Sequence, residues 1–353
     1  MCNLHEKLAN SQEFQNLLSL QHKLVNLSKE DPSDTLKLIE QYLSNRRTKS
    51  PLRSIFTLIS YISECRPENY EKSCIILSNF LEEIKNNFST EEIFHIFPNR
   101  NYQQFLLKNN ILSIEDISAH YHNNQQIIAF FTQNHQEPKI NQIIKQNDIS
   151  KFQEIISKTN LPLSSRIHFA VTDSNKLNNS SKDPTLLEYA IAYSALDIVK
   201  FILMNEEEAE LDKKDELYKD IGRYAIFGGN SEIIHLLEQN HMISDISSQR
   251  MFYLVDAISY HRNEIVDYLI ENYNSNFNFD NFSHCLQWSN FQCFYDHIDS
   301  ILNDVNQLNI YKQSLLIFAA QYGIIEIVEC LLSSYKNLNI NNQDIYVYSN
   351  FFL

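Results

Sequence analysis

Two cysteines lie among residues that could support nucleophilic chemistry. Cys285 and Cys293 occur close to His284, Asp296 and His297. A cysteine nucleophile needs a base within reach and usually a hydrogen-bond donor for the oxyanion. Cys285, however, falls at a small position of a repeating helical pattern, where we expect it to be buried and unreactive. A cysteine-dependent hydrolase is therefore an alternative to the non-catalytic function that the rest of the sequence favours.

The histidines do not form a metal-binding pattern. His120 and His122 lie two residues apart, and His135 follows further along the chain. Zinc ligands on one helix stand four residues apart so that both rings face one way, which the first spacing does not allow. We expect solvent-facing or hydrogen-bonded histidines and no metal site.

Glycine is scarce, which argues against nucleotide binding. The chain has four glycines, Gly222, Gly228, Gly229 and Gly323. A phosphate loop or a dinucleotide fingerprint needs three or more glycines, or Gly-Lys-Ser/Thr, in close register. No such set occurs, so we expect no cofactor.

The composition is typical of a folded, acidic protein. Hydrophobic residues make up 43% of the 353 residues, which supports a packed core. The net charge of −15 argues against binding to nucleic acid or anionic lipid, which needs clustered Lys and Arg. No apolar run approaches the roughly 18–20 residues of a membrane helix, and no secretory signal is visible. We expect an intracellular, cytoplasmic protein without membrane insertion, whose six cysteines stay reduced.

Residues 1–138 are predicted to form successive amphipathic helices. Helix starts are indicated by an N-cap residue ahead of proline, or by a serine followed three residues later by an acidic residue. These signals occur at Asp31–Pro32, Ser50–Pro51, Ser89 with Glu92 and Ser113 with Asp116. Pro98 and Pro138 mark helix ends.

The stretch 314–332, SLLIFAAQYGIIEIVECLL, predicts two short helices with a break at Gly323. The second carries apolar residues at the spacing of one helix face. A helix pair this short cannot bury its own apolar face and needs similar neighbours.

Similar windows precede this stretch and supply those neighbours. They begin at Thr185, Ile221 and Leu254, with a weaker copy around Cys285 and an outlying first copy at 140–156. The small positions recur roughly every 33 residues, at Ala190, Ala225, Ala257, Cys285 and Ala319, with Ile143 in the first copy. The predicted breaks are Asn147, Ser194, Gly229, His261, Ser289 and Gly323.

These copies resemble ankyrin repeats, which carry Thr-Pro-Leu-His, two small residues, Gly, Ile-Val and Leu-Leu. The window at Thr185 matches with Ala190, Ile198 and Val199, and the one at Ser314 with Ala319, Ala320, Gly323, Ile327, Val328, Leu331 and Leu332. The whole layout, with Leu27–Ile39 and the segment 143–156, is similar to protist ankyrin proteins with an N-terminal helical domain of unknown function. The resemblance implies a protein-binding helical solenoid.

Some ankyrin features are missing. Glu188 and Ile317 replace the ankyrin histidine, which ties the preceding loop by a hydrogen bond, and the hairpin glycines are absent. We therefore expect irregular connections at 205–216, 239–249, 272–282 and 303–313 in place of uniform β-fingers. Phe277, Phe279 and Phe282 are predicted to lie buried on a short extended segment.

The predicted architecture is all-α: an N-terminal helical region at 1–138, divergent ankyrin-like repeats at 139–343 and an apolar tail at 344–353, which we expect to cover the last repeat. The predicted function is a non-catalytic adaptor or scaffold that binds a protein partner, of unknown identity, through the concave face of the solenoid. We expect the chain to be a monomer. The alternative is a structural scaffold that associates with itself.

Two features could contact a partner. Aromatic residues precede four of the five later breaks, at Tyr193, Tyr260, Trp288 and Tyr322. Such rings dominate binding hot spots, but they could equally pack against the next repeat. The acidic run that begins with Glu206, Glu207 and Glu208 could meet a basic partner, or could be a solvated loop.

Overall fold

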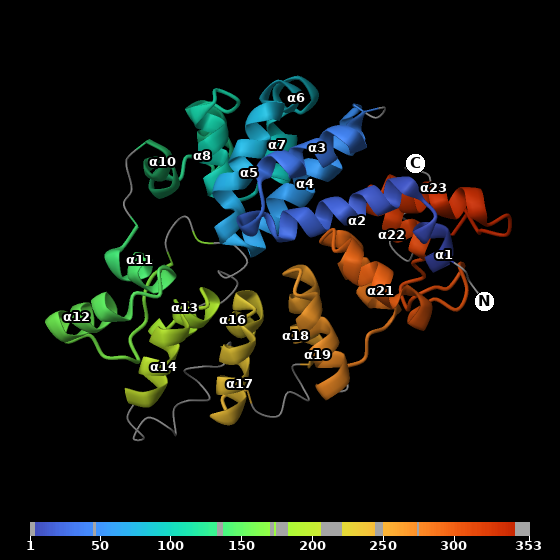
Figure 1. The fold of residues 1–353 in the computed structure, drawn as a ribbon. Helices are drawn as coiled ribbons and strands as arrows, with labels where there is room; N and C mark the ends of the chain where they lie inside the picture. The colour runs from blue at the N-terminus through green and yellow to red at the C-terminus, as the bar shows by residue number, and fades with distance from the viewer. Residues whose placement is uncertain are drawn as a thin grey trace. The chain divides into compact units, whose positions relative to one another are not determined.

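The computed structural model describes residues 4–44, 47–132, 137–169, 173, 183–205, 221–243, 250–273 and 275–342 (Figure 1). By contacts, the chain divides into two units. Unit 1 combines Met1–Pro98 with Asn276–Leu353, and unit 2 is Asn99–Ser275. The domain boundaries at 138 and 343, inferred from sequence patterns, stay a prediction, and the tail 344–353 lies outside the described residues.

The first part of unit 1 is a set of short helices. They are α1 (Leu4–Ala9), α2 (Gln12–Val25), α3 (Pro32–Leu43), α4 (Lys49–Cys65), α5 (Tyr70–Leu77), α6 (Leu81–Asn87) and α7 (Thr90–Ile96), with single 3-10 turns at Leu27–Lys29, Pro67–Asn69 and Ser78–Phe80. Asp31 caps α3 with Pro32 at its first position, and Ser89 and Glu92 form a capping box on α7, as predicted. Helix α4 begins two residues before the predicted Pro51, because Thr48 and not Ser50 is its N-cap.

Helix α4 lies at the centre of this part. It contacts α2, α3, α5 and α7, and its apolar side chains Leu52, Ile55, Phe56, Leu58 and Ile59 are fully buried. The Phe56 ring meets Phe80 and Phe88 edge-on at centroid distances of 5.8 and 6.0 Å. Aromatic pairs in this arrangement add roughly 0.5–1.5 kcal/mol each beyond the area that they bury.

The second part of unit 1 consists of two helix pairs. The first is α20 (Phe279–Gln287) with α21 (Phe291–Ile301), and the second is α22 (Leu315–Gln321) with α23 (Ile325–Ser334). Helix α20 packs on α22, and α1 and α2 pack on α21 and α23 (Figure 1). The N-terminal helices and the last two helix pairs therefore share one unit, which the sequence patterns did not indicate.

Among its described residues, unit 2 begins with three helices and continues with four helix pairs. The three are α8 (Arg100–Lys108), α9 (Ile114–His120) and α10 (Gln125–Thr132). The pairs are α11 (Lys139–Lys145) with α12 (Ile149–Thr159), α13 (Leu186–Ala192) with α14 (Leu196–Asn205), α16 (Ile221–Gly228) with α17 (Ser231–Gln239), and α18 (Arg250–Ser259) with α19 (Asn263–Tyr273). First helices contact first helices, α11 with α13, α13 with α16 and α16 with α18, while α14 contacts α12 and α17. Ser113 and Asp116 form the capping box of α9, as predicted.

All six predicted breaks separate two helices. Each break residue has a left-handed backbone, with φ between 51° and 70°, at Asn147, Ser194, Gly229, His261, Ser289 and Gly323. The left-handed region costs roughly 1–2 kcal/mol for residues other than glycine. Four of the six sites bear that cost, so the turns must be held by interactions that offset it.

Hydrogen bonds that span the break supply part of that compensation. In five pairs the amide after the break donates to the carbonyl of the small position, over 2.7–3.1 Å, as from Ala195 to Ala190 and from Asn290 to Cys285. In the α16–α17 pair, Gly229 donates to Ala225 over 2.9 Å. The bond in the five pairs is the Schellman type of helix ending and the Gly229 bond the simpler αL type; both satisfy carbonyls that a helix end leaves unpaired.

The all-α fold class is confirmed for the part of the chain that the structure describes. No strand occurs there, and the extended pairing is limited to two isolated bridges, Arg166 with Thr185 and Leu308 with Ser314. Phe277, Phe279 and Phe282 are buried, as predicted, but α20 already begins at Phe279, so the extended segment is shorter than expected. Within the described ranges, no helix combines the length and apolarity that crossing a bilayer requires.

The capping box of α7 generates a prediction about acid stability. The Glu92 carboxylate accepts a hydrogen bond from Lys49, accepts another from the Ser89 amide and pairs with Arg53. These contacts lower the pKa of Glu92 from 4.5 to about 2. A carboxyl whose pKa is lower in the folded state stabilises the fold above its unfolded pKa and loses that effect as the pH falls.

We expect Glu92→Gln to be less stable than the parent protein at pH 7. The difference should shrink as the pH falls from 4.5 and disappear near pH 2, measured by urea unfolding with circular dichroism at each pH. Glu91→Gln on the same turn serves as the control. A Glu92→Gln difference that stays constant down to pH 2 would contradict the assignment.

Candidate functional site

Within each unit the turns between paired helices form a recurring structural edge, called the turn edge of that unit here. In unit 2 each turn bonds to the next one. The Asn147 side chain accepts from the amide of Asp197 at 3.1 Å, and the Ser194 hydroxyl donates to the carbonyl of Gly228 at 3.0 Å. Arg262 donates to the same Gly228 carbonyl at 2.9 Å. The edge of unit 2 is therefore closed by hydrogen bonds between neighbouring helix pairs.

Gly228 occupies the position at which the other four later pairs carry an aromatic ring. A Cβ atom at 228 would lie 2.3 Å from the carbonyl oxygen of Ile191, at the contact between α13 and α16. Only a residue without a side chain allows this approach. The missing ring is therefore explained by close backbone packing.

In unit 2 the two predicted rings contact residues of the same unit. The Tyr193 hydroxyl donates to Asp173, and the Lys145 ammonium lies 4.7 Å from the centre of the Tyr193 ring. Tyr260 is 3% exposed and meets Phe227 edge-on at 5.3 Å. Both rings thus take part in packing between helix pairs.

In unit 1 the two predicted rings approach one residue of α4. Trp288 meets Tyr61 at a centroid distance of 5.6 Å and an interplanar angle of 62°. Tyr322 also lies near Tyr61, and burial, reinforced by that neighbour, raises the pKa of Tyr322. The structure thus brings Trp288 and Tyr322 together around Tyr61. Their role in partner binding stays a prediction.

The turn edge of unit 1 also binds α2 and α3 through buried polar groups. Gln21 of α2 donates to the Asn290 side chain at 3.1 Å and accepts from the Gln292 amide at 3.1 Å. Tyr42 of α3 donates to the buried Glu326 carboxylate. Buried polar groups are tolerated when their hydrogen bonds are made. These contacts therefore fix how α2 and α3 align with the turns of α20–α23.

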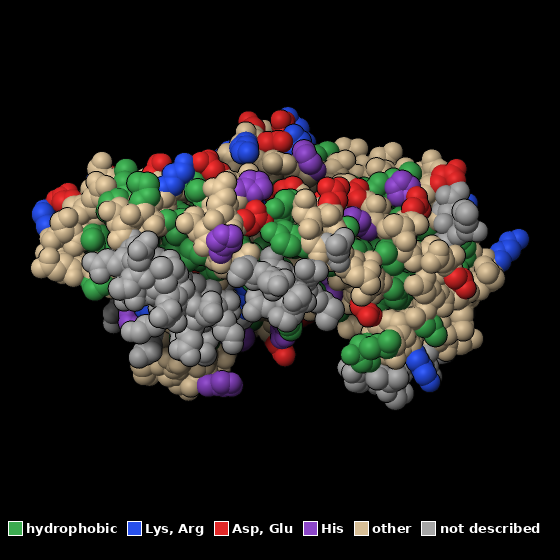
Figure 2. All heavy atoms as spheres, turned by 90° about the horizontal axis from the view of Figure 1, so that it is seen from below, with side chains coloured by type: hydrophobic (Ala, Val, Ile, Leu, Met, Phe, Trp, Pro, Cys, Tyr) green, Lys and Arg blue, Asp and Glu red, His purple; other side chains and the backbone are tan. Residues whose placement is uncertain are grey.

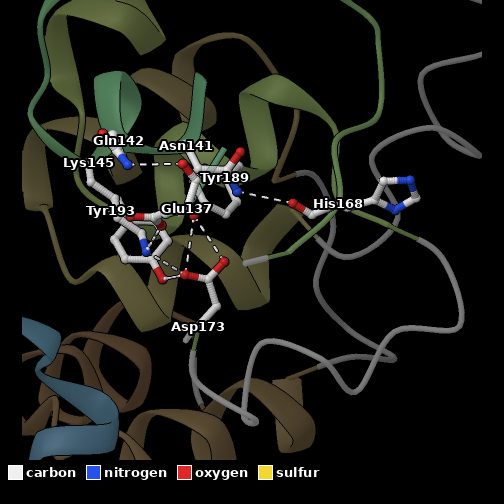
Figure 3. Close-up of polar contacts among 8 residues, drawn as sticks. All are labelled: Glu137, Asn141, Gln142, Lys145, His168, Asp173, Tyr189 and Tyr193. Atoms are coloured by element: carbon white, nitrogen blue, oxygen red, sulfur yellow. Dashed lines mark hydrogen bonds and ion pairs between the residues drawn. The ribbon is translucent and has the colours of Figure 1, made fainter. Parts of the chain in front are cut away.

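A second polar cluster lies between α11 and α13 (Figure 3). The Asp173 carboxylate, fully buried as a side chain, accepts from Lys145 at 2.6 Å, Tyr193 at 2.6 Å and Tyr189 at 3.0 Å. Lys145 also pairs with Glu137. Around the cluster, Asn141 donates to the carbonyl of His168 and Gln142 to that of Glu137.

In this cluster, hydrogen-bond donors surround the buried negative charge of Asp173. Burial raises the pKa of both Tyr189 and Tyr193, and the neighbouring Asp173 carboxylate raises it further, so both hydroxyls remain protonated donors. A buried carboxylate is costly unless it is paired and hydrogen-bonded. The geometry therefore fits a structural attachment of residue 173 to the helix pairs, a role that sequence periodicity could not reveal.

A third cluster joins α17 to α19. Glu238 accepts from Tyr268 at 2.7 Å, from Tyr273 and from His235 Nδ1 at 3.0 Å. Burial alone would raise the pKa of Glu238, but these hydrogen bonds together lower it. Glu238, Tyr268 and Tyr273 line a small, largely apolar cavity together with Gly222 and Tyr253.

Glu188, which stands where ankyrin repeats carry histidine, ties the preceding loop in another way. Its carboxylate accepts from the Thr185 amide at 2.7 Å, and the Thr185 hydroxyl accepts from the Glu188 amide at 3.1 Å. Arg166 lies 3.8 Å from the same carboxylate. A capping box and an ion pair thus take the place of the missing histidine contact.

The remaining sequence candidates are either buried in the packing of unit 1 or lie outside the described residues. Cys285 and Cys293 are both buried, as expected for packing positions, and burial lowers the pKa of the adjacent His284. The ring of His297 stacks on Phe277. Within the described ranges no group of three potential metal ligands gathers. His135 and the acidic run Glu206, Glu207 and Glu208 lie outside the described residues.

Comparison with known families adds one similarity. Residues 213–297 match the family described as "Domain of unknown function (DUF3447)", a domain found in ankyrin-repeat proteins. The matched range includes the pairs α16–α17 and α18–α19 and most of α20–α21. No curated protein matches the chain.

The close approach at Gly228 gives a stability prediction. We expect Gly228→Ala to lower the free energy of unfolding by about 1–3 kcal/mol, because the new methyl group meets backbone, which cannot rotate away. Gly323→Asn is the control, since a Cβ there has open space and asparagine tolerates the left-handed backbone. Urea unfolding would measure both, and a Gly228→Ala variant as stable as the parent would contradict the close packing.

The Asp173 cluster gives a second prediction. Tyr193→Phe should lower the free energy of unfolding by about 1.5–3 kcal/mol, because it removes a hydrogen bond to a buried charge. Tyr322→Phe should change it by no more than about 0.5 kcal/mol, since that hydroxyl has no hydrogen-bond partner among the described residues. Hydrogen exchange of the α13 amides should accelerate in the first variant only. Equal effects in both variants would argue against the attachment role.

Proposed function

We propose that the chain is a non-catalytic protein–protein interaction module, an adaptor or scaffold built as a solenoid of divergent ankyrin-like helix pairs. Six helix pairs in the described part of the chain, each with a left-handed residue at its turn, support the solenoid. The family match at 213–297 agrees with it, because that domain occurs in ankyrin-repeat proteins. Stacked helix pairs of this kind build an extended surface.

The observation that carries the proposal is the contact of α20–α23 with α2–α4. Here the turn edge of two helix pairs binds other helices through a buried Gln–Asn pair, a tyrosine–carboxylate contact and an aromatic pair. These are the contact types that protein interfaces use. A surface that recognises helices within one chain is chemically suited to recognise a helix or loop of another protein.

The partner surface is proposed to lie elsewhere than at the four rings that the sequence suggested. The sequence-based hypothesis places the partner on the concave face, along Tyr193, Tyr260, Trp288 and Tyr322. All seven residues of α13 are buried, and the four rings contact other residues of the chain. We therefore look for the partner among side chains that remain exposed. Figure 2 shows one face, on which hydrophobic side chains reach the surface at several separate places among polar and acidic ones.

The proposal is tested by reconstitution. Proximity labelling with the full-length chain in its source cell would supply candidate partners, which are then purified and titrated against the chain. We expect at least one partner to form a stoichiometric complex, measured by calorimetry and by light scattering of the mixture.

Two results would contradict the proposal. One is that no purified candidate binds the chain. The other is that the chain alone gains mass with rising concentration in light scattering, which would favour the self-associating scaffold.

A further inference from the structure

Two loops at the C-terminal end of unit 1 are joined to each other. They are residues 303–313, between α21 and α22, and residues 335–342, after α23; together they are called the loop pair. The side-chain amide of Asn306 donates to the Asn337 carbonyl at 3.0 Å, and its oxygen accepts from the Asn339 amide at 2.7 Å. One side chain thus uses both ends of its amide to hold the two loops side by side.

The longer loop is also held from within. The Asn309 oxygen accepts from the amides of Tyr311 at 3.0 Å and Gln313 at 2.8 Å. Its nitrogen donates to Asp280, at the start of α20, at 2.8 Å. Leu302, just before this loop, and Val305 within it are buried. The backbone of the loop pair is therefore ordered by its own hydrogen bonds.

Large apolar side chains project from this ordered backbone. Ile310 is 79% exposed, Leu308 is 44% exposed, and Ile340, next to the Asn306–Asn339 contact, is 51% exposed. Single exposed apolar residues are common, but several on two joined loops are unusual. Because the loops are already ordered, a partner that covers these side chains would lose little additional chain entropy.

The charges of the loop pair identify the chemistry of the partner. Lys312 and Lys336 are both exposed and form no ion pair with any described residue. The nearby carboxylates of Asp304 and Asp280 accept hydrogen bonds from uncharged amides, of Asn306 and Asn309. In a chain of 44 acidic and 29 basic residues, the loop pair thus presents two ammonium groups without an ion-pair partner among the described residues. It is complementary to a segment that carries carboxylates.

We propose that the loop pair is a docking surface for a segment of another protein in which apolar side chains alternate with carboxylates. The apolar side chains of that segment cover Ile310, Leu308 and Ile340, and its carboxylates pair with Lys312 and Lys336. The apolar contact contributes most of the affinity, while the charges select and orient the segment. This assignment rests on the proposed function, because it names the surface and the partner chemistry of the same interaction module.

The experiment uses the full-length chain and an array of 12-residue peptides. The peptides combine Leu, Ile and Phe with Glu or Asp, and a matched array replaces each acid by Lys. We expect binding to the acidic array only, and the tightest peptides are then titrated by fluorescence anisotropy. Ile310→Ser should weaken their binding about tenfold. The double variant Lys312→Gln and Lys336→Gln should weaken it by a similar factor and remove its salt dependence.

Ile75→Ser is the matched control. Ile75 is 57% exposed but lies on α5, outside the loop pair, so its substitution should leave peptide affinity unchanged. All of these side chains are exposed, and the thermal unfolding midpoint should change little in each variant.

Several outcomes would overturn the proposal. They are binding to neither array, equal binding to both arrays, and equal effects of Ile310→Ser and Ile75→Ser. A dimer that Ile310→Ser dissociates would make a second copy the occupant, and acidic-peptide binding that requires deletion of residues 343–353 would make the chain's own end the occupant. If a reconstituted protein partner binds Ile310→Ser as tightly as the parent chain, the docking proposal for the loop pair is wrong, while the proposed function as an interaction module still holds.

Discussion

The structure depends on the left-handed turn that closes each helix pair. One residue with positive φ reverses the chain, and in five of the six described turns the next amide returns to a carbonyl of the first helix, as from Ile324 to Ala319 at 2.9 Å. A short turn of this type places two helices of about two to three turns against each other. Neither helix would be stable alone in water, so the turn and the neighbouring pairs must form together.

That constraint explains the polar chemistry of the turn edge. A tight turn exposes carbonyls and amides that cannot all bond within the turn, and burying them unpaired is costly. Unit 2 satisfies them from the next helix pair, through Ser194 and Arg262 on the Gly228 carbonyl. Unit 1 uses a helix from the other end of the chain, where the Gln21 side-chain oxygen accepts from the Gln292 amide. Two sources of hydrogen-bond partners thus solve the same problem.

Whether a feature could be predicted from the sequence depends on how far apart along the chain its interacting residues lie. Breaks such as Asn147 and Ser289, and caps such as Ser89, were predictable because small-residue spacing and capping signals act within a few residues. The contact of Gln21 with Asn290 joins positions 269 residues apart and leaves no local pattern. Asp173 likewise lies in a stretch without helical periodicity, so nothing near it in the sequence indicated that Lys145, Tyr189 and Tyr193 surround it.

The rings at the turns show why residue type alone does not identify a binding surface. Trp288 and Tyr322 have the composition of a hot spot, yet Tyr61 lies against the first and near the second. An aromatic side chain stabilises whichever surface covers it, whether from the same chain or from another. A partner gains hydrophobic free energy only from apolar side chains that folding has left in water. Ile310 meets this condition on a backbone that Asn306 and Asn309 already hold in place.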